Sequence, residues 1–325
     1  MVIQHIAGQS PHCNDAIENL YRCGAGVIDK LEYLIALARE QHFGRAAEAC
    51  HITQPTLSAG IKQLEASLGV LLVQRRSRFV RLTPEGERAL EWARRIVGDA
   101  RVMRQEMTAL KRGLAGHLTI AAVPTALGMV SALTTPFHLR HPDVRFTILS
   151  RTSLEVLAQL ENLQIDAGIT YLDNEPLGRV RQIPLYRERY QLLIAADGPL
   201  GNRERVTWKE VGEVPLCLLT SDMQNRRIID RQLRAAGAEP APTLESNSMI
   251  LLYSHVKTGR WATVMPAMLA QTLGLTSTVR AIPIGEPEAV HTMGLIVPSR
   301  EPMTPLTAAL VAEARRVAPQ LDEAN

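Results

Sequence analysis

Four arginines are concentrated in one short segment of the 325-residue chain, at Arg75, Arg76, Arg78 and Arg81. No acidic residue lies between Glu65 and Glu85 to balance them. Clustered guanidinium groups repel one another unless water or an anion separates them, and phosphate is the anion they bind best. The segment therefore indicates either a contact with nucleic-acid phosphate or an arginine loop exposed to water.

Small or polar side chains precede the arginines, on the outward face of a short predicted helix. They are Thr56, Ser58, Ala59 and Lys62. Side chains of this size let the start of a helix approach base edges and phosphates in the major groove of DNA. A three-helix bundle that touches no DNA is the alternative, but we would expect Glu and Lys on its outer face.

Residues typical of catalysis or metal binding form no recognisable pattern. The chain has no Walker-type loop, no HExxH and no GxSxG, and its nine histidines are scattered. Its four cysteines show no CxxC spacing, which argues against a disulfide framework or a zinc site. The grouping of His5, His12, Cys13 and Cys23 matches no standard metal site. We therefore predict no catalytic residues, no metal and no cofactor.

The charge distribution agrees with a nucleic-acid contact near the N-terminus. Residues 29–112 hold 15 Lys and Arg against 10 Asp and Glu, whereas residues 113–325 are close to neutral. A basic module on a near-neutral body is typical of a DNA reader joined to another domain. We find no apolar stretch long enough to span a membrane and no signal peptide, so we expect no membrane contact and a cytoplasmic protein.

Several predicted elements must position these residues. Apolar spacing predicts a helix from Leu31, a short helix over residues 45–50, a turn, and a third helix over residues 54–65 with Leu57, Ile61 and Leu64 facing inward. Two short helices joined by a tight turn form a helix-turn-helix unit. Residues 71–82 then read as a short hairpin, or wing, which carries the arginines.

A long helix follows, with Thr83 as its N-cap and Pro84 in its first turn. Its apolar residues recur at steps of three and four: Ala93, Ile96, Ala100, Met103, Met107 and Leu110. Such a seam needs a partner, and the same helix of a second chain would give a two-fold dimer. Packing of the seam on the chain's own C-terminal domain is the alternative. Gly113 and Gly116 end the helix and form a hinge.

From residue 117 the pattern alternates between strands and helices, in the order βαβαβ, and a second set begins near residue 190. This order predicts parallel sheet covered by helices. Two α/β lobes joined by two crossing strands fit the count, and a ligand would bind in the cleft between them, at the carboxyl ends of the strands.

These motifs resemble the LysR-type transcriptional regulators. The resemblance is carried by residues 45–48 (RAAE), 54–58 (QPTLS), 61–65 (IKQLE), 68–69 (LG) and 81–86 (RLTPEG), in register. It implies an α/β protein with an N-terminal winged helix-turn-helix, a long linker helix, and a two-lobed effector domain like the periplasmic binding proteins. The chain departs from the family at Ala59, which is followed by Gly60 and where the family usually has Arg, and at Val73, where the family commonly has Phe.

The resemblance also implies which residues touch DNA. Carried over by position, five residues would face the major groove and three would hold flanking phosphate: Gln54, Pro55, Thr56, Ser58 and Lys62, then Arg75, Arg76 and Arg78. Its further implication is a small effector in the cleft. Candidate residues follow the predicted strands: Pro124, Thr125, Thr152, Ser153, Tyr171, Ser221, Met223, Asn225 and Asn247. The set is rich in hydroxyls and amides, not charges, and two of its segments open helices, which suits a small anion; ordinary N-caps are the alternative.

We therefore expect a poorly ordered extension at residues 1–28, a DNA-binding domain at 29–83, a linker and dimerisation helix at 84–112, and an effector domain at 117–318. Its first lobe would comprise residues 117–188 and 276–318, and its second residues 189–275. The expected partners are double-stranded promoter DNA, a small metabolite, a second or further copies of the chain in a homodimer or homotetramer, and RNA polymerase. An enzyme on a two-lobed fold with an accessory DNA domain, and a transport-type solute receptor, are the alternatives.

Overall fold

The computed structural model describes residues 26–75, 80–285 and 287–323. The predicted extension at residues 1–28 lies outside this part, except for its end, where helix α2 (Val27–Glu40) already begins. The chain divides into two compact units, Met1–Arg101 and Val102–Asn325, and each is described by itself. Among the described residues, no helix combines the length and apolar character needed to cross a membrane.

The N-terminal unit is a three-helix bundle with a small hairpin. Its helices are α2, α3 (Phe43–Ala49) and α4 (Gln54–Leu68), and its strands β1 (Val73–Arg75) and β2 (Val80–Leu82) pair antiparallel. Leu57, Ile61 and Leu64 of α4 are buried, as predicted. The predicted helix-turn-helix and wing are confirmed, although α3 begins two residues before the predicted helix.

Gly60 lets α4 lie close against α2. A Cβ atom at Gly60 would lie 2.7 Å from Cδ2 of Tyr33, and Tyr33 is itself buried in the bundle. Any larger residue would push the ring or the helix away. Glycine at position 60 therefore has a packing cause, whereas the neighbouring Ala59, where the chain departs from the family, is exposed.

The base of the wing is fixed by two side chains. Glu65, near the end of α4, accepts hydrogen bonds from the amides of Leu72 (2.9 Å) and Val73 (3.2 Å). Thr83 donates to the carbonyl of Leu71 (2.7 Å) and accepts from the amide of Gly86 (2.9 Å). Thr83 thus caps α5 (Pro84–Arg112), as predicted, while tying the hairpin to it.

Helix α5 carries an exposed apolar stripe. Ile96, Met103, Met107 and Leu110 are 41–80% exposed, which is unusual for large apolar side chains. Ala93, predicted to belong to this seam, is fully buried instead, as are Val97 and Val102. The apolar residues of α5 therefore divide between an inward and an outward face.

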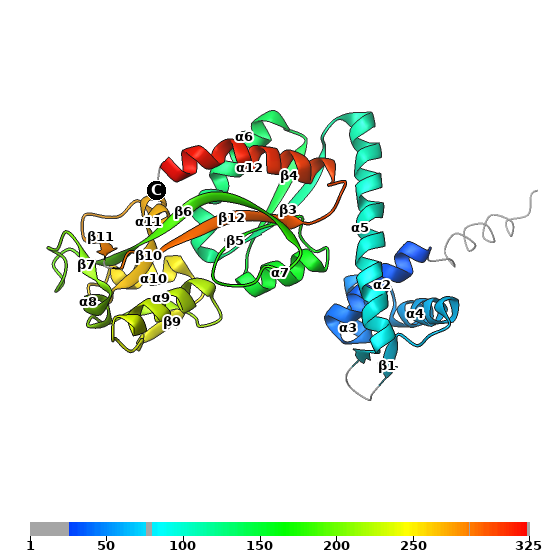
Figure 1. Cartoon of the computed structure of the whole chain (residues 1–325), viewed down its shortest axis with the longest axis horizontal. Coiled ribbons are helices and arrows are strands. Elements are labelled where there is room, and N and C mark those ends of the chain that lie inside the picture. The colour runs from blue at the N-terminus through cyan, green and yellow to red at the C-terminus, as the bar shows by residue number, and fades with distance from the viewer. Residues whose placement is uncertain (1–25, 76–79, 286, 324–325) are drawn as a thin grey trace, which may run out of the picture. The chain divides into compact units, whose positions relative to one another are not determined.

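The C-terminal unit is built on one curved sheet of eight strands, in the order β4-β3-β5-β12-β6-β11-β7, with β10 also paired to β6 (Figure 1). The strands are β3 (Gly116–Ala122), β4 (Val144–Ser150), β5 (Ala167–Tyr171), β6 (Val180–Ala195), β7 (Val206–Thr207), β10 (Thr263–Pro266), β11 (Val279–Gly285) and β12 (Val290–Pro298). Strands β3, β4 and β5 are parallel, as the βαβαβ order predicted.

The first lobe is covered by helices on both faces of the sheet. Leu118, Ile120 and Ala122 of β3 pack under α6 (Val130–Arg140) and α12 (Pro305–Glu323). Ala121, which points the other way, packs against α7 (Ser153–Glu161). Residues 124–129 form a 3₁₀ helix, η1 (Pro124–Met129), before α6.

Strand β6 joins the two lobes, because its first half pairs with β12 and its second half with β10 and β11. The sequence predicted that the second set of strands begins near residue 190, so the part of this 16-residue strand before Tyr190 was not predicted. The second lobe adds a separate parallel pair, β8 (Cys217–Leu219) with β9 (Leu244–Ser246), and four helices: α8 (Trp208–Gly212), α9 (Gln224–Ala235), α10 (Met249–Val256) and α11 (Ala267–Leu273). Helices α8 and α11 were not predicted.

Side chains of alternating β6 residues face different helices of the second lobe. Leu192 and Ile194 belong to the same apolar cluster as Ile229 of α9, whereas Leu193 packs in a cluster with Leu252 of α10.

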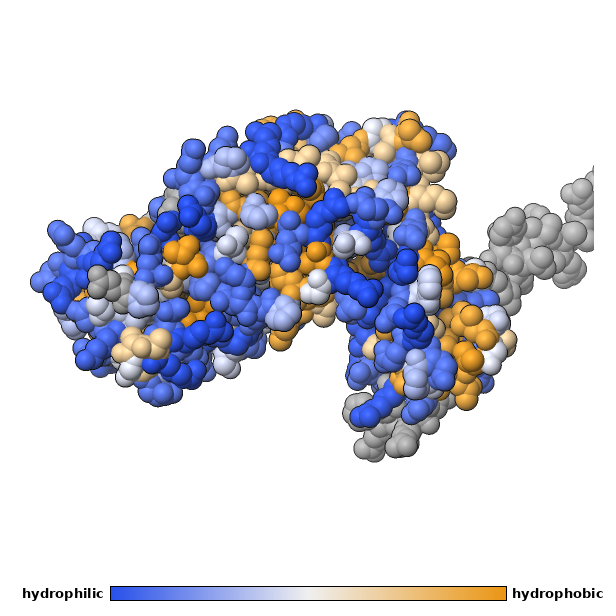
Figure 2. Space-filling view, viewed as in Figure 1, coloured by the Kyte–Doolittle hydropathy of each residue, from blue (hydrophilic) through white to orange (hydrophobic). Residues whose placement is uncertain are grey.

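On the face of the C-terminal unit seen in Figure 2, hydrophilic residues cover most of the surface and hydrophobic residues form small groups between them.

Candidate functional site

The start of α4 presents a polar face outside the bundle. Gln54, Pro55, Thr56 and Lys62 are exposed, and Ser58 is half-buried. The helix begins directly after the turn, with Thr53 as its N-cap. The Thr53 hydroxyl accepts from the amide of Thr56 (3.4 Å) and lies 2.8 Å from the Thr56 hydroxyl. The predicted DNA-contacting residues of α4 thus occupy one accessible surface.

The described residues include only part of the wing that carries the predicted phosphate contacts. Arg75 ends β1, and Arg81 of β2 is exposed. Arg76 and Arg78 lie outside the described residues, as does the side chain of Arg75. Arg81, which was part of the arginine cluster, is therefore the wing cation whose exposure the structure gives directly.

In the C-terminal unit, the hydroxyl of Tyr171 is a meeting point of four elements. Tyr171 ends β5 and is fully buried. Its oxygen lies 3.2 Å from Oγ1 of Thr125 in η1, and it accepts from Nδ2 of Asn225 in α9 at 3.1 Å. It also donates to the carboxylate of Glu188 in β6. Three predicted effector residues, Thr125, Tyr171 and Asn225, are thus brought together from both lobes.

Glu188 was not predicted, and it is the buried acid of this cluster. Burial raises the pKa of Glu188 to about 7, and the hydrogen bond from Tyr171 opposes that rise only in part. His291, its cross-strand neighbour in β12, lies 3.3 Å from the carboxylate of Asp173. Burial lowers the pKa of His291, although Asp173 acts in the opposite direction. Glu188 is therefore a fully buried carboxyl group between the two lobes whose pKa lies near neutral.

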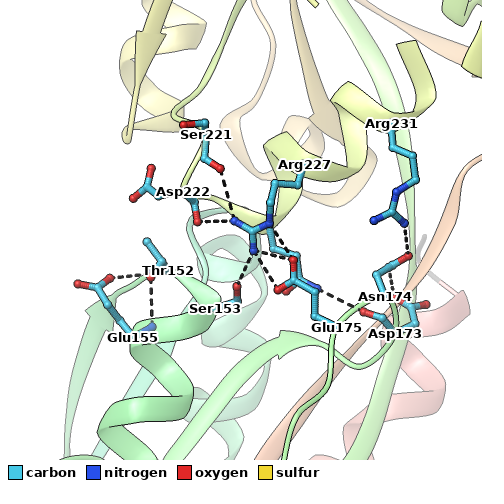
Figure 3. Close-up of polar contacts among 11 residues, drawn as sticks. Thr152, Ser153, Glu155, Asp173, Asn174, Glu175, Ser221, Asp222, Arg227 and Arg231 are labelled. Atoms are coloured by element: carbon cyan, nitrogen blue, oxygen red, sulfur yellow. Dashed lines mark hydrogen bonds and ion pairs between the residues drawn. The ribbon is translucent and has the colours of Figure 1, made fainter. Parts of the chain in front are cut away.

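A second polar group joins the lobes at the guanidinium of Arg227, in the first turn of α9 (Figure 3). Its Nε and Nη2 donate to the two carboxylate oxygens of Glu175, at 2.8 and 2.9 Å. Nη2 also donates to the hydroxyl of Ser153 (3.3 Å), the first residue of α7. Nη1 donates to the backbone carbonyls of Asp222 (2.7 Å) and Ser221 (3.4 Å).

The other predicted effector residues lie outside the hydrogen bonds around the Tyr171 hydroxyl, and only Ser221 among them meets the guanidinium of Arg227. Thr152 caps α7 and is bound to Glu155, and Pro124 begins η1. Met223 is buried at the N-cap of α9. Asn247 is exposed and takes no part in the contacts around Tyr171 or Arg227. Ser221 meets Arg227 through its backbone carbonyl oxygen.

The sequence pointed to hydroxyl and amide side chains, and the structure also places charged side chains beside them. Glu175, Glu188 and Arg227 lie directly among the predicted residues. The alternation of Tyr186, Glu188 and Tyr190 on one side of a strand was the available signal for Glu188. Arg227 and Glu175 are 52 residues apart, and no local pattern links them.

Within the described residues, no three His, Cys, Asp or Glu side chains are grouped to hold a metal ion. Cys217 is buried in β8, and burial raises the pKa of its thiol to about 11. Its Sγ donates to the carbonyl oxygen of Leu252 at 3.7 Å. This thiol therefore lacks the exposure and the low pKa of a reactive cysteine.

Comparison with known proteins agrees with both units. The family model described as "Bacterial regulatory helix-turn-helix protein, lysR family" matches residues 28–87. The family model described as "LysR substrate binding domain" matches residues 111–319. The "Hydrogen peroxide-inducible genes activator" of Dickeya chrysanthemi is 30% identical over 277 residues, covering 85% of this chain and 90% of the relative. The "DNA-binding transcriptional dual regulator OxyR" of Escherichia coli (strain K12) has the same identity and coverage.

Solved structures show the same architecture. A full-length OxyR variant from Pseudomonas aeruginosa has a TM-score of 0.70 and 28% identity, and the match covers 91% of this chain and 97% of that one. CbnR, described as a LysR family transcriptional regulator, has a TM-score of 0.58 at 22% identity, covering 90% of this chain and 99% of that one; this shows the fold alone. Because the relatives are regulators, the alternative of an enzyme with an accessory DNA domain is set aside. The chain belongs to the LysR family of DNA-binding transcriptional regulators, whose C-terminal domain responds to a small molecule.

Proposed function

We propose that this regulator reads promoter DNA with Gln54, Pro55, Thr56, Ser58 and Lys62 of α4 and holds the flanking phosphates with Arg75, Arg76 and Arg78 of the wing. The observation that carries the proposal is the polarity of α4. Its apolar residues are buried in the bundle, while the first turns present small polar side chains and one lysine to the outside. A helix with this surface can enter the major groove.

The effector is proposed to be a small anionic metabolite bound between the two lobes. Thr125, Ser153, Tyr171 and Asn225 supply buried hydroxyl and amide groups from both lobes, and Arg227 adds a positive charge beside them. Pro124, Thr152, Ser221, Met223 and Asn247 would form its surroundings. A ligand that touches both lobes changes how they approach each other, and so can change the DNA-bound form.

Oxidation of thiols is a different input, which the names of the peroxide-inducible relatives suggest. Between residues 51 and 325 the sequence has one cysteine, Cys217. That thiol is buried and has a raised pKa, so it reacts slowly with peroxide and has no second cysteine in its domain. We therefore propose a ligand held without a covalent bond.

The exposed stripe of α5 supports a homodimer or homotetramer, because burial of Ile96, Met103, Met107 and Leu110 against a second copy would remove them from water. Promoter binding also implies RNA polymerase as a partner. It implies the cytoplasm as the location, since bacterial promoters and RNA polymerase are found there.

Fluorescence anisotropy of the full-length protein with labelled DNA from the region upstream of its own coding sequence tests the proposal. We expect specific binding that survives an excess of unrelated DNA and changes when a metabolite panel is added. Equal affinity for specific and unrelated DNA at moderate salt would contradict it.

A further inference from the structure

Arg227 is bound to a carboxylate that belongs to the opposite lobe. The planar guanidinium meets both oxygens of Glu175, through Nε at 2.8 Å and Nη2 at 2.9 Å. This two-point geometry is the one by which arginine recognises any carboxylate. The side chains of Arg227 and Glu175 are 32% and 26% exposed, so a small molecule in water can reach them.

The guanidinium does not depend on Glu175 for its position. Nη1 donates to the carbonyl oxygens of Asp222 and Ser221, which lie just before α9 in the same lobe. If the carboxylate of Glu175 moved away, these two bonds would still aim Nε and Nη2 in the same direction. The charge is therefore prepared in advance to receive a carboxylate.

Ser153 adds a second group to the same position. It is 2% exposed, it begins α7, and its hydroxyl oxygen accepts from Nη2 of Arg227 at 3.3 Å. The hydroxyl proton remains available for an oxygen bound at the guanidinium. Figure 3 shows Ser153 and Glu175 lying on the same side of the guanidinium, between the two lobes.

Glu175 belongs to a short turn, and side chains from one face of α9 form hydrogen bonds with this turn. Gln224 donates to the carbonyl of Asp173 and Arg231 donates to the side chain of Asn174, both at 3.3 Å. With Arg227, these residues repeat at helical spacing, and Asn174 has a left-handed backbone conformation with φ of 73°. The turn is outside the regular strands, so the loss of one carboxylate contact would alter how α9 meets the first lobe.

We propose that Arg227 and Ser153 form the carboxylate subsite of the effector and that Glu175 occupies this subsite as an internal competitor. The inference rests on the proposed effector site and narrows its ligand to carboxylic acids. An effector carboxylate displaces Glu175 from Arg227 and so removes the charged contact by which α9 holds the turn at residues 173–175, leaving the contacts of Gln224 and Arg231. The exchange of one carboxylate for another keeps the guanidinium paired, which a neutral ligand would not do.

Sodium acetate is the probe, with acetamide as its neutral isostere and sodium chloride at equal ionic strength. The full-length wild type is compared with Glu175→Ala, Glu175→Ala/Arg227→Gln, and the control Glu239→Ala, which removes the acid of an exposed pair with Arg234. Thermal unfolding and calorimetry report binding. Acetate should bind Glu175→Ala about tenfold more tightly than the wild type or the control, acetamide should bind none of them, and the double variant should lose the gain.

Acetate binding that is equal in the wild type and Glu175→Ala, or that persists in the double variant, would overturn the subsite. Circular dichroism establishes that each variant is folded. DNA anisotropy of the same samples separates the two proposals. If Glu175→Ala binds specific DNA but not acetate, only the subsite is rejected. If the wild type does not bind DNA specifically, the proposed function is rejected.

Discussion

The hydroxyl of Tyr171 donates to the carboxylate of Glu188, within the strand that joins the two lobes. The same oxygen accepts from Asn225 of the second lobe at 3.1 Å. One buried hydroxyl thus connects the end of β5, the crossing strand β6 and the first turn of α9. Both side chains are fully buried, so the protonation of Glu188 decides which atom donates in this contact.

We predict that Glu188→Gln makes stability less dependent on pH. The pKa of Glu188 is about 7 in the folded protein and near 4.5 in an exposed chain. A raised pKa means that its stabilising contribution is present below about pH 4.5 and is lost as the pH rises through 7. The difference in unfolding free energy between variant and wild type should therefore grow by up to about 3 kcal/mol from pH 5 to 8.

Urea unfolding at several pH values, followed by tryptophan fluorescence, measures this difference. Glu239→Gln is the control, because the side chain of Glu239 is 80% exposed, and its difference from the wild type should stay flat. A constant difference for Glu188→Gln would mean that Glu188 is ionised throughout this range.

Local patterns predicted most of the fold. The spacing of Leu57, Ile61 and Leu64 gave the face of α4 that is buried, and Thr83 with Pro84 gave the start of α5. These features depend on residues within one or two helical turns. The parallel strands of the first lobe were predicted because a helical pattern separates each strand from the next.

Contacts between distant residues could not be predicted in this way. The first half of β6 contains Arg181, Arg187, Glu188 and Arg189, and it is a strand because β12, about a hundred residues later, pairs with it. Arg227 of the second lobe meets Glu175 of the first lobe, 52 residues away in the sequence. The pairing of Gly60 with Tyr33 likewise depends on how α4 crosses α2.

Lys62→Ala should weaken DNA binding and reduce the salt dependence of the affinity by about one unit of slope, because one phosphate contact is lost. Anisotropy titrations across a range of salt concentrations measure both quantities. Lys209→Ala removes the same charge from an exposed position in α8 and should leave the slope unchanged. Equal slopes for Lys62→Ala and the wild type would place Lys62 away from the phosphates.

Gly60→Ala should destabilise the N-terminal unit by about 1–3 kcal/mol, since the new methyl group would lie 2.7 Å from the ring of Tyr33. Helix propensity alone predicts the opposite sign, a gain of about 1 kcal/mol. Thermal unfolding of the single variants and of Tyr33→Leu/Gly60→Ala measures the coupling. The double variant should recover part of the loss; a stabilised Gly60→Ala would show that the helices separate without cost.

Met107→Glu should dissociate the oligomer, because it puts a charge into the exposed apolar stripe of α5, where Met107 is 50% exposed. Size-exclusion chromatography with light scattering reports the mass. Thr108→Glu places the same charge on the neighbouring exposed residue, off the stripe, and should keep the mass of the wild type. An unchanged mass for Met107→Glu would mean that copies associate through another surface.

Hydrogen peroxide should leave DNA binding unchanged, and Cys217→Ser should behave as the wild type does. The Cys217 thiol is fully buried and its pKa is about 11, so almost none of it is thiolate at neutral pH and a thiolate is what peroxide attacks. Labelling of the folded protein with a thiol reagent, followed by mass spectrometry of the peptide that contains Cys217, should find it unmodified until urea is added. A change in DNA affinity with peroxide that disappears in Cys217→Ser would instead make this buried thiol the sensor and would contradict a non-covalent effector as the only input.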